Sequence, residues 1–273
     1  MTSDSEKNFS LAPFLLAALQ VLLVAATVYV FISGKYAPPA PITSVGVEID
    51  HQYDMTLVVV AIAFISSQLG LAWVILRYRD HGQKVLFSRG NNTLEALWTT
   101  ITAVVFVGLG LAGGRAWANS RNLPETPDMI RIEVTEAQFA FNFRYAGPDG
   151  KFGRIDPKQV DASLGNPLGL DPSDPAGADD IVVPTLTLPV DHEVELLLRS
   201  QDVIHSFFVR ELRLQQDAVP GLIVPLRFKA DKIGRYEVVC TQLCGLGHSN
   251  MHTYLSVVSE ADFAAFLKSG GGN

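Results

Sequence analysis

Cysteine is nearly absent from this 273-residue sequence, which has only two, Cys240 and Cys244, four positions apart. Two cysteines are too few to build a disulfide framework, so the fold cannot depend on one. No CxxCH motif occurs, which excludes a covalently attached haem in this chain. The two cysteines are also too close together to be accidental core residues, so the pair points to a specific chemical role.

Basic side chains are in the minority, with 21 Lys and Arg against 28 Asp and Glu. All of the net charge of −7 lies from Ala118 onward, where 14 basic residues stand against 21 acidic ones. An acidic surface argues against a nucleic-acid partner and suits a basic protein partner, because complementary fields speed encounter. Acidity that only keeps the domain soluble is an equally good explanation.

Long apolar runs are plentiful, in contrast, and three of them are long enough to cross a lipid bilayer, which takes roughly 20 helical residues. They cover residues 11–32, 55–78 and 94–117. We therefore expect an N-terminal helix and external loop in residues 1–53, and a transmembrane helical hairpin in residues 54–117.

The connecting loops predict how these helices are oriented. The first connection carries only Lys35, whereas the second carries four basic residues: Arg77, Arg79, Lys84 and Arg89. Because cytoplasmic loops are enriched in Lys and Arg, the second connection should be cytoplasmic. The C-terminal domain then lies on the periplasmic side of a bacterial-type inner membrane.

The first apolar run is compatible with either a retained helix or a cleaved signal peptide. Its leading ten residues carry Asp4 and Glu6 against a single Lys7, and no clear small-x-small cleavage site follows the run. The run is also long for a signal-peptide core. A retained helix is favoured, and a mature N-terminus near Ala37 is the alternative.

Residues 118–273 are predicted to form a β-domain. Short β-rich runs alternate with Gly, Pro and Asp, and cover residues 129–136, 138–145, 185–189, 193–198, 203–209, 223–229, 235–239 and 252–258. Short strands punctuated in this way indicate an antiparallel sandwich or barrel. Residues 261–268 should close the domain as a short helix with Ser259 as its N-cap.

A Gly-, Pro- and Asp-rich insertion interrupts these strands at residues 147–180 and ends in the run DPSDPAGADD. Its carboxylates could bind calcium, a hard ion that prefers oxygen ligands. The spacing matches no EF-hand loop, so a solvated excursion is the favoured interpretation.

The segment VCTQLCGLGHSNMHT, residues 239–253, has the side chains of a metal site. Cys240, Cys244, His248 and Met251 fall within one short loop, so a single excursion of the chain can present them to one point. Thiolate and thioether ligands are soft and select copper(I) or related metals, and imidazole suits copper in either oxidation state. His205, in the segment DVIHSFFV, is the natural candidate to complete the ligand shell.

Three other sites would use only part of this set. A disulfide is allowed outside the cytoplasm but leaves the His and Met spacing unexplained. A structural zinc site of two Cys and two His leaves the methionine without a role. A blue-copper site uses one thiolate and leaves the second surplus. Two thiolates that bridge two copper ions use every residue, and this is the favoured interpretation.

The pattern CxQxCGxxHxxM, preceded by DVIHSF and QQDAVPG, closely resembles subunit II of cytochrome c oxidase in the haem–copper oxidase superfamily. The resemblance covers residues 53–267. It implies a cupredoxin-like β-sandwich that holds the binuclear copper centre CuA, and a transmembrane hairpin against the catalytic subunit. The ligands it implies are the bridging Cys240 and Cys244, one histidine per copper from His205 and His248, the thioether of Met251 and the backbone carbonyl of Gln242.

Two departures from the family pattern concern Gln242, within this motif, and Phe139, in the segment QFAFNFRY. The family usually has glutamate at the position of Gln242, where its carboxylate helps to bind magnesium at the boundary with the catalytic subunit. A neutral amide holds a hard cation more weakly, so a weak or absent magnesium site is expected.

The family typically has tryptophan at the position of Phe139, where electrons from cytochrome c arrive. Asp202 and Glu211 are candidate docking carboxylates, with generic solvated charge as an equal alternative.

Glu95 lies in LEALWTT at the start of the third apolar run, where a carboxylate should sit at the edge of the hydrocarbon. Its context resembles the family's ExxWT signature, in which the glutamate lies at the mouth of a proton-uptake path into the catalytic subunit. An interfacial carboxylate favoured by the helix dipole is the alternative.

The resemblance as a whole implies a terminal-oxidase subunit II. Such a subunit accepts electrons from a c-type cytochrome or cytochrome c domain and passes them to haem in subunit I, which reduces O2 to water with proton translocation. Other oxidase subunits are further partners. Two alternatives are a CuA protein resembling nitrous oxide reductase, which has a large additional domain, and a copper-delivery protein. Four methionines in the whole chain argue against a Met-rich copper carrier.

Overall fold

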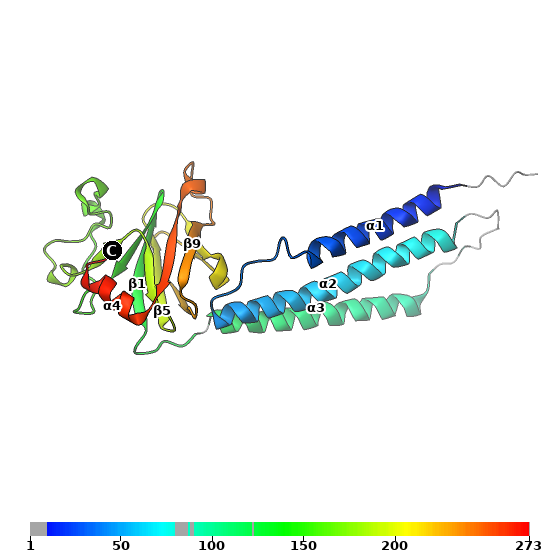
Figure 1. Ribbon diagram of the computed structural model, residues 1–273, viewed down its shortest axis with the longest axis horizontal. Helices are drawn as coiled ribbons and strands as arrows, with labels where there is room; N and C mark the ends of the chain where they lie inside the picture. Colours follow the sequence, from blue (N-terminus) through cyan, green and yellow to red (C-terminus); the bar gives the residue numbers. More distant parts are fainter. Residues whose placement is uncertain (1–9, 80–86, 88–89, 122, 273) are drawn as a thin grey trace, which may run out of the picture. The chain divides into compact units, whose positions relative to one another are not determined.

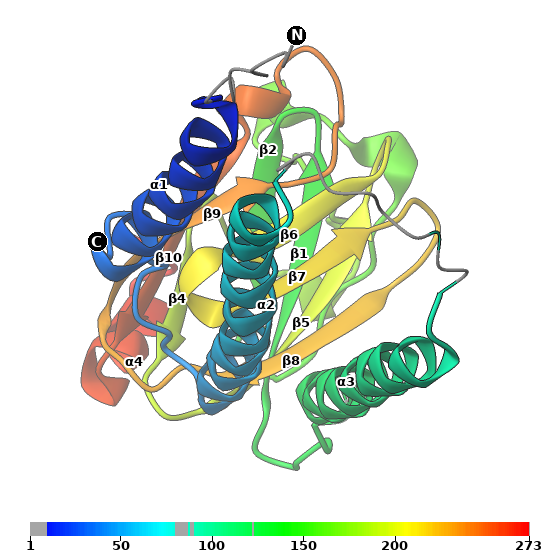
Figure 2. The same cartoon turned by 90° about the vertical axis from the view of Figure 1, so that its right-hand side faces the viewer.

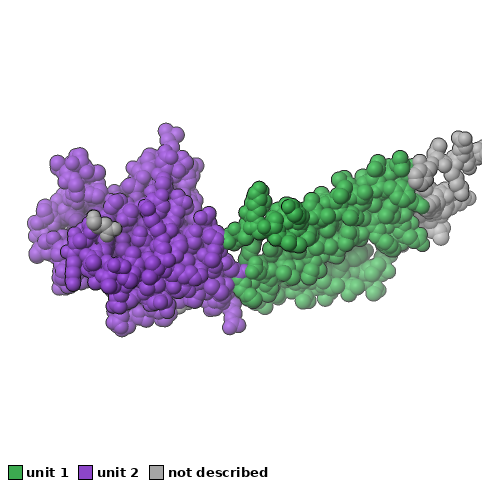
Figure 3. Space-filling model, viewed as in Figure 1, with its two compact units in different colours: residues 1–38, 51–113 green, residues 39–50, 114–273 purple. Residues whose placement is uncertain are grey.

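The computed structural model describes residues 10–79, 87, 90–121 and 123–272. The chain divides into two compact units (Figure 3), residues 1–38 with 51–113 and residues 39–50 with 114–273. The first unit holds most of the long helices, and the second holds the strands (Figure 1).

Three helices are long and apolar enough to cross a membrane: α1 (Ala12–Ile32), α2 (Ser44–Arg77) and α3 (Asn92–Arg121). The most apolar windows of these helices have mean hydropathies of 2.5, 2.2 and 1.8. Helices of this kind are stable in lipid because every backbone hydrogen bond is made within the segment. The three predicted membrane helices are therefore confirmed.

Some residues used in the sequence arguments lie outside the described residues. These are Lys84 and Arg89 in the second connection, and Asp4, Glu6 and Lys7 near the N-terminus. The orientation of the helices and the choice between a retained helix and a signal peptide stay predictions.

Helix α2 begins at Ser44, well before the apolar run predicted from residue 55. Its first turns carry Glu48 and Asp50, so hydropathy alone does not reveal them. The buried hydroxyl of Thr43 accepts the backbone N–H of Gly46 at 2.8 Å, which caps the helix. The polar start of α2 belongs to the same compact unit as the β-domain.

The β-domain is a sandwich of two five-stranded sheets (Figure 2). One sheet has the order β3-β2-β1-β5-β8, with bounds Ile181–Val183, Ala140–Tyr145, Ile130–Ala137, Glu193–Ser200 and Val224–Lys229. The other has the order β4-β10-β9-β6-β7, with bounds Leu186–Pro189, His252–Val258, Gly234–Cys240, His205–Val209 and Leu214–Ala218. The predicted cupredoxin-like sandwich is confirmed.

The sheets are mixed, whereas the strand pattern predicted antiparallel pairing. β1 pairs with β5 in parallel, and β10 pairs with β4 in parallel. A parallel pair needs a long crossover connection. The chain between β1 and β5 supplies one, because it includes the 147–180 insertion. Side chains alternate in the same way in parallel and antiparallel strands, so the sequence pattern does not reveal this pairing.

The core is built from alternating side chains of the two sheets. On β2, Phe141, Phe143 and Tyr145 are buried, as expected for one strand face. Phe139 has the same spacing but lies in the turn between β1 and β2 and is 40% exposed. Helix α4 (Glu260–Lys268) packs beside Tyr145 and is capped by Ser259 as predicted, because the Ser259 hydroxyl accepts the backbone N–H of Asp262 at 3.2 Å.

The insertion contains three short 3-10 turns, and it contacts the first sheet through Arg144, which binds Gly153 and Asp180. Asp156, Asp161 and Asp174 each cap one turn by accepting backbone N–H groups. This use of carboxylates is local turn chemistry and does not require a cation. Among the described residues, the acidic side chains of the insertion form no cluster of three potential metal ligands. Calcium binding here stays an unsupported hypothesis.

An acid is buried inside the sandwich, at the end of β1. Glu136 is fully buried, and within the described part of the chain neither of its carboxylate oxygens has a hydrogen-bond partner. Burial, with a smaller contribution from the nearby charge of Asp217, raises the pKa of Glu136 well above its ordinary value. Glu136 is therefore protonated in the folded protein at a pH where the unfolded chain has lost that proton.

Replacing Glu136 with glutamine should stabilise the domain at neutral and alkaline pH. The folded protein binds more protons than the unfolded chain, so stability falls as pH rises above the ordinary glutamate pKa, by up to ~1.4 kcal/mol per pH unit. Glu136→Gln removes this loss, and its advantage should shrink toward pH 4. Unfolding measured from pH 4 to 9 tests this, with the exposed Glu237→Gln as control. Parallel pH profiles for Glu136→Gln and the unmodified protein would contradict it.

Candidate metal centre

The strand register brings the two separate parts of the predicted site to one end of two neighbouring strands in the second sheet. His205 is the first residue of β6 and Cys240 is the last residue of β9. These strands are antiparallel, with Phe207 opposite Cys240, so His205 and Cys240 lie at the same end. The backbone N–H of Cys240 also donates to the Met251 carbonyl at 3.1 Å, which closes the loop between β9 and β10.

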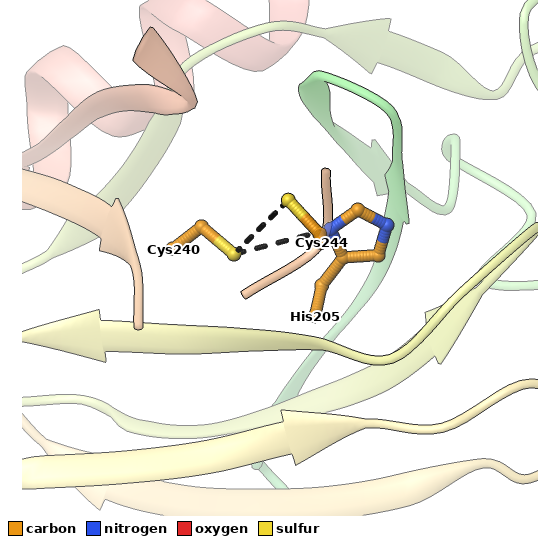
Figure 4. A group of neighbouring side chains, drawn as sticks. All are labelled: His205, Cys240 and Cys244. Carbon is orange, nitrogen blue, oxygen red and sulfur yellow. Dashed lines mark hydrogen bonds between the residues drawn. The ribbon is translucent and has the colours of Figure 1, made fainter. Parts of the chain in front are cut away.

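The donor atoms converge within this loop. The imidazole of His205 and the sulfurs of Cys240 and Cys244 point toward one another (Figure 4), and their ligand atoms all lie within 4.8 Å of one another. Cys240 Sγ lies 3.9 Å from Cys244 Sγ and 3.9 Å from His205 Nδ1.

The remaining predicted ligands lie against the two sulfurs. His248 Nδ1 is 3.6 Å and Met251 Sδ is 3.9 Å from Cys244 Sγ. The backbone oxygen of Gln242 is 3.2 Å from Cys240 Sγ. The structure thus brings together all six predicted groups: His205, Cys240, Gln242, Cys244, His248 and Met251.

The donor set fits a soft metal ion. Both cysteines are free thiols, and their sulfur separation is about twice the ~2.05 Å of a disulfide bond. His205, Cys240, Cys244 and Met251 are all buried. Two thiols, an imidazole and a thioether are buried there, and the partly exposed imidazole of His248 lies beside them. These are the ligand types that copper prefers.

The thiol of Cys244 holds its proton at neutral pH. Burial, and then the neighbouring Cys240, raise the pKa of the Cys244 thiol to about 11. The thiolate is the form that binds metal, so metal binding must release this proton.

The ring of His205 is oriented by Asp202. His205 Nε2 lies 2.7 Å from Asp202 Oδ1, which leaves Nδ1 facing the sulfurs. Partial burial disfavours the charged carboxylate, but hydrogen bonds from His205 and from backbone N–H groups outweigh it and lower the pKa of Asp202. A histidine ligand held by a carboxylate in this way has a fixed ring position. Asp202 was predicted only as a docking carboxylate, although its D-x-x-H spacing to His205 is a signal for this second role.

The other predicted docking residues lie in different places. Phe139 is exposed beside the loop, where its ring approaches Gly245 and Gly247. Glu211 lies in the short 3-10 turn η4 (Arg210–Leu212), beyond the end of β6 opposite His205, and its side chain is only 13% exposed. The structure therefore does not bring Glu211 to the metal cluster.

Glu95 lies in the first turn of α3, in the helical unit. The side-chain oxygen of Asn91 accepts the N–H groups of Thr93 and Leu94 at 3.0 and 3.2 Å, which caps this helix end. A carboxylate in the first turn also interacts favourably with the helix dipole.

Gln138 is a residue of the site that the sequence reasoning missed. It lies in the turn between β1 and β2, and its side-chain amide donates to the backbone oxygen of Cys244. Its backbone N–H donates to Asp202 Oδ2 at 2.7 Å. No spacing rule links residue 138 to the metal loop, because the contact depends on how the two sheets pack.

Comparison with known proteins gives consistent similarities. The family model described as cytochrome C oxidase subunit II, periplasmic domain, matches residues 178–258, a range that contains all six grouped residues. The chain is 32% identical to the alternative cytochrome c oxidase subunit 2 of Bradyrhizobium diazoefficiens, over 81% of this chain and 79% of that one. It is 30% identical to the cytochrome c oxidase subunit 2 of Thermostichus vulcanus, over 81% and 74% of the two chains. The solved periplasmic domain of subunit II of cytochrome oxidase from Bradyrhizobium japonicum aligns over 54% of this chain and 95% of that chain, with 24% identity and a TM-score of 0.39.

Proposed function

The chain belongs to the family of cytochrome c oxidase subunit II, and from this we propose that it receives electrons from a c-type cytochrome at a binuclear copper centre and passes them to haem in the catalytic subunit. The observation that carries the proposal is the cluster in which two free thiols, two imidazoles, a thioether and a backbone carbonyl meet, with His205, both cysteines and Met251 buried. Reduction of O2 to water, coupled to proton translocation, would take place in the partner chain.

Each group has an assigned part in holding the two ions. Cys240 and Cys244 would bridge both coppers, and His205 and His248 would bind one each. Met251 and the backbone oxygen of Gln242 would complete the two coordination shells. Copper ions held in this way share one electron, which permits one-electron relay with little structural change. The chain's own contribution is a largely buried donor set whose His205 ring is held by Asp202.

Electron paramagnetic resonance of the purified, copper-loaded full chain tests this function. We expect two copper ions per chain and a spectrum in which the unpaired electron is shared by two copper nuclei. Metal analysis on the same sample distinguishes the alternatives. A spectrum of a single copper ion, or zinc alone, would contradict the proposal.

The surroundings of the centre support a docking role on the periplasmic side of the inner membrane. The exposed Phe139 ring lies against the metal loop and is the proposed site where electrons arrive. Asp202 is 32% exposed and is a second candidate contact for a basic donor. Electron-transfer rates from the donor should fall with ionic strength if charge steers docking. Rates independent of salt would remove the electrostatic part of this proposal.

The haem-bearing subunit I and other oxidase subunits are the expected partners of a subunit II chain. The amide of Gln242 replaces the carboxylate that binds magnesium at that boundary in the family. We therefore propose that the assembled oxidase binds this magnesium weakly. Metal analysis that finds one tightly bound magnesium ion per complex would contradict this.

Glu95 is the proposed entrance for protons on the cytoplasmic side. Its place in the first turn of α3 supports a position at the edge of the hydrocarbon. Glu95→Ala should slow oxidase turnover and proton pumping together, while the copper content stays unchanged. Unchanged turnover and pumping in reconstituted vesicles would reject this role.

A further inference from the structure

We propose that Gln138 is a positioning residue that ties together the two segments carrying the metal donors. The proposal rests on the proposed copper function, because it concerns the same site. Gln138 lies in the two-residue turn between β1 and β2, in the sheet that contributes none of the proposed ligands.

One end of Gln138 reaches the His205 side of the site. Its backbone N–H donates to Asp202 Oδ2 at 2.7 Å, and the other carboxylate oxygen of Asp202 lies 2.7 Å from His205 Nε2. A change in the position of the turn is therefore transmitted through one carboxylate to the ring of a proposed ligand.

The other end of Gln138 reaches the cysteine side. Its side-chain amide donates to the backbone oxygen of Cys244. The ends of the metal loop are tied to the sheet, because Cys240 N–H donates to Met251 and Thr241 N–H donates to Ser206. The middle of the loop receives its hydrogen bond from the rest of the domain through Gln138.

Close packing supports the same contact independently of the hydrogen bonds. A Cβ atom added to Gly247 would lie 2.5 Å from a ring carbon of Phe139, the other residue of the turn. A Cβ added to Gly245, whose φ is +141°, would lie 2.8 Å from Gln138 Nε2. The two glycines of the CGLGH segment thus leave room for the turn to lie directly on the loop.

Gln138→Met tests the contribution of the hydrogen bond apart from that of packing, because methionine has a similar length and lacks the amide donor. Groups that orient ligands typically change metal affinity by roughly 10- to 100-fold when they are lost. We expect Gln138→Met to release copper to a chelator at least 10-fold faster than the unmodified chain, and to show altered copper hyperfine splitting. In the copper-free chain, the two thiols should be alkylated several-fold faster.

The test uses the full chain in detergent, with Gln159→Met as the matched control. Gln159 lies in the insertion, and its amide donates to Asp156 Oδ2 in the same turn at 3.4 Å. If Gln138→Met does not fold, Gln138→Asn supplies the comparison, because its amide is too short to reach Cys244. Release, alkylation and hyperfine splitting that match those of the control would overturn the positioning role.

The outcomes also separate this proposal from the proposed function. An unmodified chain that holds one copper or a zinc ion would overturn the two-copper function alone. The comparison of Gln138→Met with Gln159→Met remains valid in that case, since release is measured for whichever metal the unmodified chain holds. A binuclear spectrum with equal release from all variants overturns the positioning role alone.

Discussion

Replacement of Cys240 with serine is expected to abolish the binuclear copper signal and to lower copper content from two ions to one or none per chain. The Cys240 sulfur lies at the centre of the cluster, 3.9 Å from both Cys244 Sγ and His205 Nδ1 and 3.2 Å from the Gln242 oxygen. A serine hydroxyl is a hard donor that stays protonated at neutral pH, so it cannot bridge two soft ions.

Turnover of the assembled oxidase with reduced cytochrome c should fall in the same variant. We expect a loss of more than about 100-fold, which exceeds the effect typical of groups that only orient a ligand. Leu246→Ser is the matched control, because Leu246 lies in the same loop and its side chain is fully exposed. It should retain two copper ions. A Cys240→Ser chain that keeps both ions and the shared-electron spectrum would contradict the bridging role.

Much of this site could be predicted from the sequence because its chemistry is concentrated in one loop. Cys240, Cys244, His248 and Met251 are separated by only three or two residues, so a single turn of chain must bring them close. His205 was proposed as a ligand from the segment DVIHSFFV. The register of β6 against β9 explains why it lies at the same end of the sheet as Cys240. The resemblance to a known family supplied the backbone oxygen of Gln242, which no residue pattern encodes.

The residues that orient the ligands could not be predicted in the same way. Gln138 reaches Cys244 across 106 positions of sequence, and the contact exists only when the two sheets are packed. Glu211, in contrast, is close to His205 in the sequence but distant from it in the structure. It lies six positions after His205, but an extended strand advances about 3.3 Å per residue and carries Glu211 to the far end of the sandwich.

The strand pairing shows a similar limit. The short β-rich runs predicted most of the strands, and alternating side chains such as Phe141 and Phe143 form their buried faces. The parallel pairing of β1 with β5 was not predicted, because alternation is the same in parallel and antiparallel strands. The charged start of α2 was missed for a related reason, since Glu48 and Asp50 hide a helix from a search for apolar runs.

Replacement of Arg144 with alanine is expected to produce the largest loss of stability in the β-domain. Arg144 is only 1% exposed, on the outer face of the first sheet beneath the insertion. Its guanidinium binds Glu133 at 2.9 Å, the backbone oxygen of Gly153 at 2.6 Å, and the buried carboxylate of Asp180. Without it, two carboxylates remain buried without this cation, and removal of one partner from a buried pair costs about 3–5 kcal/mol.

The insertion itself provides the matched control for this effect. Arg154 also binds two carboxylates, those of Asp171 at 3.0 Å and Asp174 at 3.4 Å, but its side chain is 69% exposed. Exposed pairs contribute about 0–1 kcal/mol, so Arg154→Ala should be nearly neutral.

Urea unfolding of the two variants in detergent compares two arginines with similar partners and different burial. A loss of unfolding free energy below about 1 kcal/mol for Arg144→Ala would contradict the prediction. A loss of that size is typical of ion pairs that are screened by water. The copper spectrum of Arg144→Ala below its unfolding transition should stay unchanged, since none of the proposed ligands contacts Arg144 in the described structure.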